Sequence, residues 1–134
     1  MREIKFRAWD KERKKMVGGC CNLMFDCSGI IYWQFGYSEP QMLGRGDESG
    51  FMLMQFTGLT DRNGVEIWEG DILNTWVGIS SKPHKTKVIF EDAAFRGEPC
   101  DVGYVKFSIG NEFQQHEVIG NIYENPELLE AADA

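Results

Sequence analysis

The amino-acid sequence predicts a small, mainly β protein, a barrel or a sandwich, with one short helix at its C-terminal end. Short runs of β-branched and aromatic residues occur along the whole chain, and turn-forming residues separate them. Only the last few residues carry signals for the start of a helix. The 134 residues, 43% of them hydrophobic, suit one core. We therefore expect a single unit over residues 1–134, with two lobes, 1–50 and 51–134, as the alternative.

Four strands are expected in the first half of the chain. Residues 4–9 alternate between apolar and basic side chains, and residues 16–17 begin a second strand. Residues 30–35 are almost wholly apolar, which is typical of a strand covered on both faces. Residues 51–56 form the fourth. Between the last two, residues 36–50 contain so many glycine, proline and acidic residues that they predict an irregular loop.

A series of hairpins is expected in the second half. Asn63-Gly64 supplies the positive φ angles that a tight hairpin requires. Strands are expected at residues 65–68, 72–77, 86–91, 103–109 and 117–123, with a linker that contains Gly97, Pro99 and Cys100. Asn125 predicts the N-cap of the terminal helix, and Pro126 suits its first position.

The charge of the chain argues against one class of partner. The formal net charge is −7, whereas non-specific DNA binding needs clustered positive charge. The charge is unevenly spread: residues 1–15 carry seven basic and three acidic groups, and the other 119 residues carry 7 basic and 18 acidic groups. Such a split can steer a partner, or dock one subunit on another, although it also fits a solvated strand and hairpin.

The cysteines and the hydropathy pattern indicate a reducing compartment. Cys20 and Cys21 are adjacent and cannot close a relaxed disulfide, and the spacing from Cys21 to Cys27 matches no common zinc motif. No apolar run approaches the roughly 20 residues that span a bilayer, and the N-terminus does not resemble a secretory signal. We expect a cytoplasmic protein with reduced thiols and no membrane partner.

Candidates for catalysis and metal binding are weak in this sequence. Asp61 to Ile72 does not place glycine and glutamate as a calcium loop requires, which favours a hairpin turn. Glu66, Glu69 and Asp71 are clustered carboxylates that favour solvated turns over acid–base chemistry. His84 and His116 lack the partners that a catalytic motif would supply. We expect no catalytic residue, no metal site and no cofactor.

Aromatic and basic residues form the candidate interaction surface. Seven of the 17 aromatic residues lie between Phe25 and Phe56, and any that stay exposed would make a face for oligomer or peptide contacts. Basic residues beside aromatic platforms would suit single-stranded nucleic acid instead. The candidate residues are Lys5, Arg7, Trp33, Phe35, Tyr37, Lys82, His84 and Lys85.

Three segments together resemble the YopX family, small uncharacterised proteins of bacteriophages and prophages of Gram-positive bacteria. Residues 2–10 are similar to the start of the family, and residues 117–129 to its C-terminal pattern. Residues 56–72, with the sequence FTGLTDRNGVEIWEGDI, resemble its central signature. Residues 18–50 carry none of this pattern.

The resemblance implies a fold and an assembly, and it implies no activity. The implied fold is an SH3-like β-barrel with additional N-terminal strands and one short C-terminal helix, and the implied assembly is a homo-oligomer in the cytoplasm of a bacterial host. Each signature residue has a structural reason: glycines serve turns, Asp71 caps a strand start, and Ile67 and Ile72 face the core. The structural signature comprises Gly58, Asp61, Gly64, Gly70, Asp71, Asn125 and Pro126.

Three functional hypotheses follow from these observations. The favoured one is a non-enzymatic phage accessory protein, a homo-oligomeric β-barrel module that acts through contacts with itself and with a host or phage protein. The alternative is a barrel that binds single-stranded nucleic acid through Lys5, Arg7, Lys82, His84 and Lys85. A metal-dependent hydrolase that uses the carboxylates near residue 69 and a histidine is the least favoured.

Overall fold

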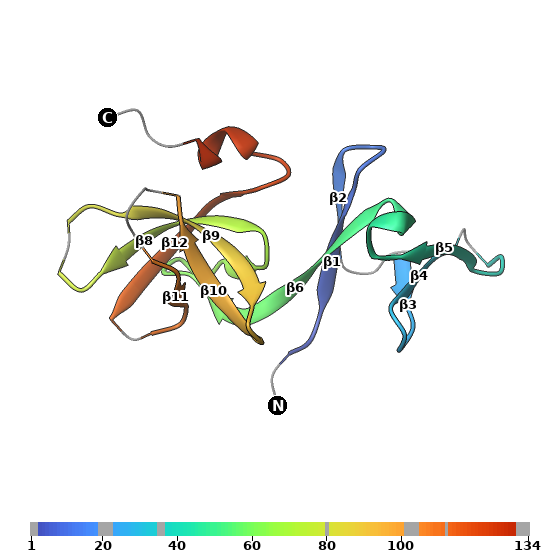
Figure 1. The fold of residues 1–134 in the computed structure, drawn as a ribbon, viewed down its shortest axis with the longest axis horizontal. Helices are drawn as coiled ribbons and strands as arrows, with labels where there is room; N and C mark the ends of the chain where they lie inside the picture. The colour runs from blue at the N-terminus through green and yellow to red at the C-terminus, as the bar shows by residue number, and fades with distance from the viewer. Residues whose placement is uncertain are drawn as a thin grey trace. The chain divides into compact units, whose positions relative to one another are not determined.

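The computed structural model describes residues 3–18, 23–34, 37–79, 81–100, 105–111 and 113–130, and over these ranges the chain folds into β-strands and two short 3-10 helices (Figure 1). The prediction of a mainly β protein is confirmed. The chain divides into two compact units: an N-terminal unit of residues 5–55 and a C-terminal unit of residues 1–4 and 56–134. Strand β6 (Phe51–Thr60) contributes its first half to the N-terminal unit and its second half to the C-terminal unit.

Strand β1 (Phe6–Asp10) is the central strand of the first sheet in the N-terminal unit. It pairs antiparallel with β2 (Lys15–Gly18) on one side and with the first half of β6 on the other. Ala8 lies opposite Val17 and Leu53, and it is completely buried. The small side chain of Ala8 therefore sits where the neighbouring strands leave no access to water.

A buried carboxylate shapes the hairpin between β1 and β2. Asp10 is 3% exposed, and its Oδ1 accepts hydrogen bonds from the main-chain N–H groups of Glu12 and Arg13, both at 3.1 Å. Its Oδ2 lies 3.3 Å from Nη1 of Arg13. These bonds satisfy main-chain donors that the turn would otherwise leave unpaired, which explains why a polar run forms an ordered connection.

The second sheet of the N-terminal unit corrects one sequence expectation. It has the order β3 (Leu23–Phe25), β4 (Ile30–Trp33) and β5 (Gln41–Arg45), and β5 is followed by a 3-10 helix at Gly46–Ser49. The prediction of an irregular loop over residues 36–50 is therefore wrong from residue 41 onward. The register of β4 and β5 shifts near Gly44, whose φ is +114°, so the glycine serves an irregularity within a strand.

The C-terminal unit contains a five-stranded antiparallel sheet. Its order is β11 (Phe107–Ser108), β10 (Ala94–Pro99), β9 (His84–Glu91), β8 (Asp71–Val77) and β12 (Gln114–Asn121). The second half of β6 pairs with β7 (Glu66–Trp68). The sheet is strongly curled.

The core of the C-terminal unit lies where β7, β8 and β9 face one another. Ile67, Leu73 and Val88 are buried there, and partly buried apolar residues from β6, the β11–β12 connection and β12 pack against them. The expectation that Ile67 and Ile72 face the core is confirmed, because both are fully buried. Each such side chain stabilises the folded state by about 1.5–3 kcal/mol relative to an exposed position.

The expected linker around Gly97 and Pro99 is instead strand β10. Gly97 pairs with Phe107, and a Cβ atom built on Gly97 would lie 2.5 Å from Cζ of Phe107. The phenyl ring thus occupies the space that a side chain at position 97 would need. The glycine allows an aromatic ring to lie across the strand. In the sequence alone, such a glycine looks the same as a glycine in a loop.

The expected short terminal helix is a single 3-10 turn, and Asn125 does not cap it as predicted. Pro126–Leu129 forms a single turn of 3-10 helix, with Pro126 in the first turn as predicted. Asn125 occupies the N-cap position, but its side chain makes no cap hydrogen bond; its Oδ1 accepts from the N–H of Asn121 at 3.2 Å. Within the described residues, no helix has the length and apolar character to cross a membrane.

The glycines and Asp71 of the signature occupy positions that need their backbone or side-chain properties. Gly64 (φ +83°) lies in the hairpin turn and Gly70 (φ +87°) in the corner before β8. Gly58 (φ +86°) lies inside β6, where the pairing with β7 is irregular, and not in a turn as expected. Oδ2 of Asp71 accepts the N–H of Trp68 at 2.7 Å, as the expectation of a capped strand start requires.

Asp61 joins the hairpin turn to strand β12. Its Oδ1 accepts the N–H groups of Asn63 at 2.8 Å and Val65 at 2.9 Å, and its Oδ2 accepts the N–H of Val118 at 2.9 Å. Burial by itself would raise the pKa of Asp61, but the N–H donors of Val118, Val65 and Asn63 together lower it below its ordinary value. The carboxylate is therefore held ionised by the main chain.

Replacing Asp61 with alanine should destabilise the protein by about 2–4 kcal/mol, because three main-chain donors lose a charged acceptor. Urea unfolding monitored by tryptophan fluorescence measures this change. Glu39→Ala, which removes one carboxylate at an exposed position, is the control and should change the free energy of unfolding by less than about 0.5 kcal/mol. Equal effects of the two substitutions would contradict the role assigned to Asp61.

Candidate functional site

The residues of the predicted interaction surface are divided between the two units. Lys5 precedes β1 and Arg7 lies within it, in the N-terminal unit, and Trp33 ends β4 in the same unit. In the C-terminal unit, His84 and Lys85 begin β9, and Lys82 precedes that strand. Tyr37 is fully exposed, and Phe35 lies outside the described residues. Their joint role as an interaction surface stays a prediction.

Trp33 is a packing residue of a shallow pocket in the N-terminal unit. Its ring stacks on Phe51 with the centroids 5.7 Å apart, and the guanidinium carbon of Arg13 lies 6.0 Å from the ring centroid. The pocket has a volume of about 210 Å³, and Asp10 and Ser49 also line it. Trp33 is half-buried and has both an aromatic and a cationic neighbour within the N-terminal unit.

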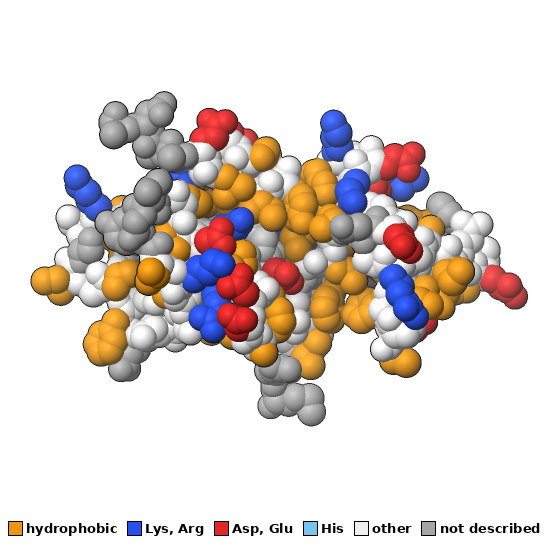
Figure 2. Space-filling model, viewed as in Figure 1, with side chains coloured by type: hydrophobic (Ala, Val, Ile, Leu, Met, Phe, Trp, Pro, Cys, Tyr) orange, Lys and Arg blue, Asp and Glu red, His pale blue; other side chains and the backbone are white. Residues whose placement is uncertain are grey.

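An apolar row crosses the sheet of β3, β4 and β5. Met24 lies opposite Tyr32, and Tyr32 lies opposite Met42, so the three side chains share one face. Met42 is 67% exposed and Met24 is 37% exposed. The Tyr32 hydroxyl donates to Oδ2 of Asp26 at 3.1 Å. We call Met24, Tyr32 and Met42 the apolar row; Figure 2 shows exposed hydrophobic side chains over this sheet.

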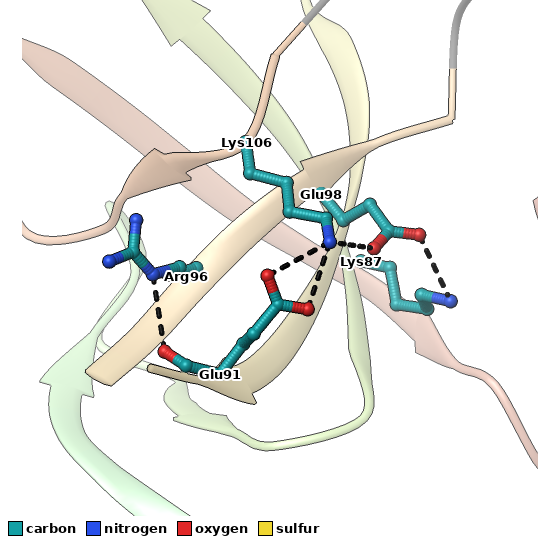
Figure 3. A network of polar contacts seen from close by, with 5 residues as sticks. All are labelled: Lys87, Glu91, Arg96, Glu98 and Lys106. Atoms are coloured by element: carbon teal, nitrogen blue, oxygen red, sulfur yellow. Dashed lines mark hydrogen bonds and ion pairs between the residues drawn. The ribbon is translucent and has the colours of Figure 1, made fainter. Parts of the chain in front are cut away.

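A network of opposite charges covers β9 and β10 in the C-terminal unit (Figure 3). Nζ of Lys106 lies 2.9 Å from one carboxylate oxygen of Glu91 and 3.7 Å from Glu98, and Lys87 lies 3.4 Å from Glu98. The hydrogen bond with Glu91 raises the pKa of Lys106, and the same bond lowers the pKa of Glu91. Figure 2 shows acidic and basic side chains side by side in this region. The pairs are partly exposed and add little stability. They do, however, neutralise lysine side chains that would otherwise be able to bind a polyanion such as nucleic acid.

The clustered carboxylates of the sequence have structural positions. Asp71 begins β8, and its side chain caps the turn before that strand. Glu66 begins β7, and Glu69 lies in the turn between β7 and β8. Over the described ranges, no group of three or more His, Cys, Asp or Glu side chains could hold a metal ion.

A second pocket, in the C-terminal unit, lies between the end of β6 and the start of β12. It has a volume of about 270 Å³. The residues that line it are Leu59, Thr60, Asp61, Arg62, Gly110, Asn111, Gln114, Gln115 and His116. The main-chain N–H of Arg62 donates to the carbonyl oxygen of His116 at 2.9 Å, which fixes the turn beside β12. The Arg62 guanidinium stacks on Trp76, with its carbon 4.7 Å from the ring centroid.

His116 is the buried titratable group of this pocket. It is 6% exposed, and its Nδ1 lies 3.0 Å from Oγ1 of Thr75, which is fully buried on the neighbouring strand. Nε2, on the other side of the ring, is buried and has no hydrogen-bond partner. Burial lowers the pKa of His116, and the charge of Asp61 opposes this shift. His116 is therefore neutral at pH 7.

The sequence indicated His116 only as a weak candidate for a general base, and it gave no sign of Thr75 or Gln114. Thr75 lies within the strand expected at residues 72–77, and Gln114 begins β12 ahead of the strand expected at 117–123. Neither position carries a signal in the sequence, because the burial of a polar atom is known only from the fold. The register that places Thr75 opposite His116 depends on the folded sheet.

The free energy of unfolding should fall as the pH drops from about 7.5 to 5.5. Because the pKa of His116 in the folded state lies below its ordinary value of 6.5, the unfolded state binds the proton first as the pH falls through 6.5. One such group contributes a slope of at most about 1.4 kcal/mol per pH unit. Urea unfolding at pH 7.5, 6.5 and 5.5 should show a smaller slope for His116→Gln than for the wild type. Identical slopes would contradict a buried neutral imidazole.

Comparison with known proteins identifies relatives with the same fold. The crystal structure of protein YopX from Bacillus subtilis matches with a TM-score of 0.68 and 23% sequence identity, over 99% of this chain and 100% of that chain. The crystal structure of protein EF1440 from Enterococcus faecalis matches with a TM-score of 0.61 and 34% identity, over 97% of this chain and 100% of that chain. No match was found among curated proteins.

The family assignment rests on a match along almost the whole chain. The model of the family described as YopX protein matches residues 5–130, a range that covers the whole N-terminal unit and most of the C-terminal unit. The resemblance noted from three segments of the sequence is thereby confirmed. The chain belongs to the YopX family.

Proposed function

We propose that this protein is a non-enzymatic accessory protein of a bacteriophage or prophage, an SH3-like β module that forms homo-oligomers and acts through protein contacts in the host cytoplasm. The observation that carries the proposal is the apolar row on the sheet of β3, β4 and β5. Apolar surface of this kind is stabilised when a second protein surface removes it from water.

The edges of the same sheet support self-association. In the sheet order, β3 and β5 are the outer strands, so each has one side without a described partner strand. An edge strand offers main-chain N–H and C=O groups to another strand, and an exposed apolar face beside it adds burial. A second copy of the chain supplies the same combination of edge and face, which is the arrangement that a symmetric dimer contact uses.

The charge of the two units supports contacts between unlike surfaces as well. The N-terminal unit has seven basic and six acidic residues, whereas the C-terminal unit has seven basic and 15 acidic residues. The N-terminal unit of one copy is thus a better electrostatic partner for the C-terminal unit of another copy than a second C-terminal unit is. In the C-terminal unit, Lys87 and Lys106 are paired with carboxylates, which makes this unit a poor surface for nucleic acid.

Light scattering coupled to size exclusion tests the proposal. At micromolar concentrations the wild type should have a mass of at least twice the 15.3 kDa of one chain. Met42→Asp places a charge in the apolar row and should shift the protein to a smaller species, by at least tenfold in dissociation constant, because a buried unpaired charge is costly.

Ile79→Asp is the matched control for this substitution. Ile79 is 105% exposed and belongs to the C-terminal unit, whereas the apolar row belongs to the N-terminal unit. It should leave the mass unchanged. A monomeric wild type, or an equal effect of Ile79→Asp, would reject assembly through the apolar row. A gel shift of single-stranded DNA at low salt would instead favour the nucleic-acid hypothesis.

A further inference from the structure

Two buried polar atoms beside the pocket of the C-terminal unit lack hydrogen-bond partners. They are Nε2 of His116 and Oε1 of Gln114. Both residues line the pocket, and because they are two positions apart on β12, their side chains lie on the same face of the strand. A buried polar group without a partner costs about 1–3 kcal/mol, so two such groups beside one pocket indicate that something else satisfies them.

The hydrogen bond between Thr75 and His116 bears on whether Nε2 of His116 donates or accepts. The Thr75 hydroxyl is buried, and its described polar contact is with Nδ1 of His116. The contact fits either direction, because the roles of Oγ1 and Nδ1 depend on the tautomer of the ring. Donation from Thr75 to Nδ1 uses the buried hydroxyl proton and leaves the ring proton on Nε2, and this tautomer is part of the proposal below. In this tautomer His116 offers an N–H donor on the side of the ring opposite Thr75.

The orientation of Gln114 is also determined by a contact. Its side-chain Nε2 donates to the carbonyl oxygen of Ser108 at 3.2 Å. The amide oxygen is thereby the unpartnered atom, and it can only accept. The pocket thus has one donor, from His116, and one acceptor, from Gln114, on residues whose positions along a strand are about 6.6 Å apart.

We propose that this pocket binds a neutral amide group, whose carbonyl oxygen accepts from Nε2 of His116 and whose N–H donates to Oε1 of Gln114. An amide carries an acceptor and a donor side by side, so a single amide group can form one hydrogen bond with each of the two atoms. A carboxylate has no donor and would place its lone pairs against the Gln114 oxygen. The 270 Å³ pocket is large enough for a carboxamide with a short aliphatic chain.

Binding at the two buried atoms requires side chains that line the pocket to move, because each atom has almost no surface accessible to water. Arg62 is exposed and lines the pocket, and exposed side chains change rotamer within nanoseconds. This proposal is independent of self-association, because the apolar row lies in the N-terminal unit and the pocket lies in the C-terminal unit. The amide can belong to a free small molecule or to an Asn or Gln side chain of a protein.

Nitrogen-15 NMR of the histidine side chains in the full-length protein tests the proposal in two steps. The chain has two histidines, and the signals of His84 serve as an internal reference. Without ligand, the spectrum of His116 should show the tautomer protonated at Nε2. A spectrum that shows Nδ1 protonated would overturn the donor assignment and, with it, the amide class.

Titration with propionamide is the second step. The His116 signals should shift with a dissociation constant in the millimolar range, as expected for so small a ligand, whereas the His84 signals and a titration with propionate should show no shift. Absence of a shift with propionamide would overturn the proposal and indicate that water alone satisfies the two atoms.

A glutamine substitution isolates the acceptor. Gln114→Leu removes Oε1 and should weaken propionamide binding at least fivefold, while the His84 signals report whether the fold is kept. Gln34→Leu is the matched control, because the Gln34 amide also donates to one main-chain oxygen, that of Ser38 at 2.8 Å, but lies in the N-terminal unit. Equal binding by Gln114→Leu and the control would overturn the role of Gln114.

Two blocked tripeptides distinguish the source of the amide. With methyl ester blocks at the C-terminus, which carry no primary amide, acetyl-Gly-Gln-Gly should bind more tightly than acetyl-Gly-Glu-Gly if the natural ligand is a protein side chain. Binding of propionamide without binding of either peptide indicates a free small carboxamide. Failure of propionamide and of both peptides to shift the His116 signals would reject the proposal for both sources.

Discussion

The carboxylate of Asp61 is the interaction on which the C-terminal unit depends most. It stabilises its own turn through two N–H groups and reaches strand β12 through a third, that of Val118. The two residues are 57 positions apart, so one side chain links the beginning of the unit to its last strand. The pocket lies directly beside this link, because Asp61 and Arg62 form one of its walls and His116 the other. The same carboxylate thus stabilises a local turn and holds that turn against a strand distant in the sequence.

The positions of the glycines explain why the strand pattern was predictable and the connections were not. The run at residues 65–68 alternates, and the run at 72–77 is rich in β-branched and aromatic residues, so both predict strands. The sequence predicts a linker around Gly97, whereas the glycine makes room for the ring of Phe107. A glycine that permits a turn and a glycine that permits a neighbour look alike in sequence.

The candidate sites show the same division between local and long-range information. The hairpin at Asp61–Gly64 and the cap made by Asp71 follow from turn chemistry, and they were predicted. The apolar row needs the register of three strands, and the pairing of His116 with Thr75 needs two strands that are 41 residues apart. Neither is encoded in the spacing of residues along the chain. The contacts of Trp33 with Phe51 and Arg13 likewise join residues that are far apart in the sequence.

The N-terminal unit is formed by one uninterrupted stretch of chain, and this has a consequence for synthesis on the ribosome. Residues 5–55 are complete before most of the C-terminal unit has been translated. At about 5–20 residues per second, the remaining stretch takes roughly 4–16 s, which is long compared with the closure of a small antiparallel sheet. The sheet edges of β3 and β5 are therefore available to a neighbouring nascent chain before β12 emerges. In the proposed homo-oligomer, chains translated from one messenger RNA would meet through their first halves while their second halves are still being made.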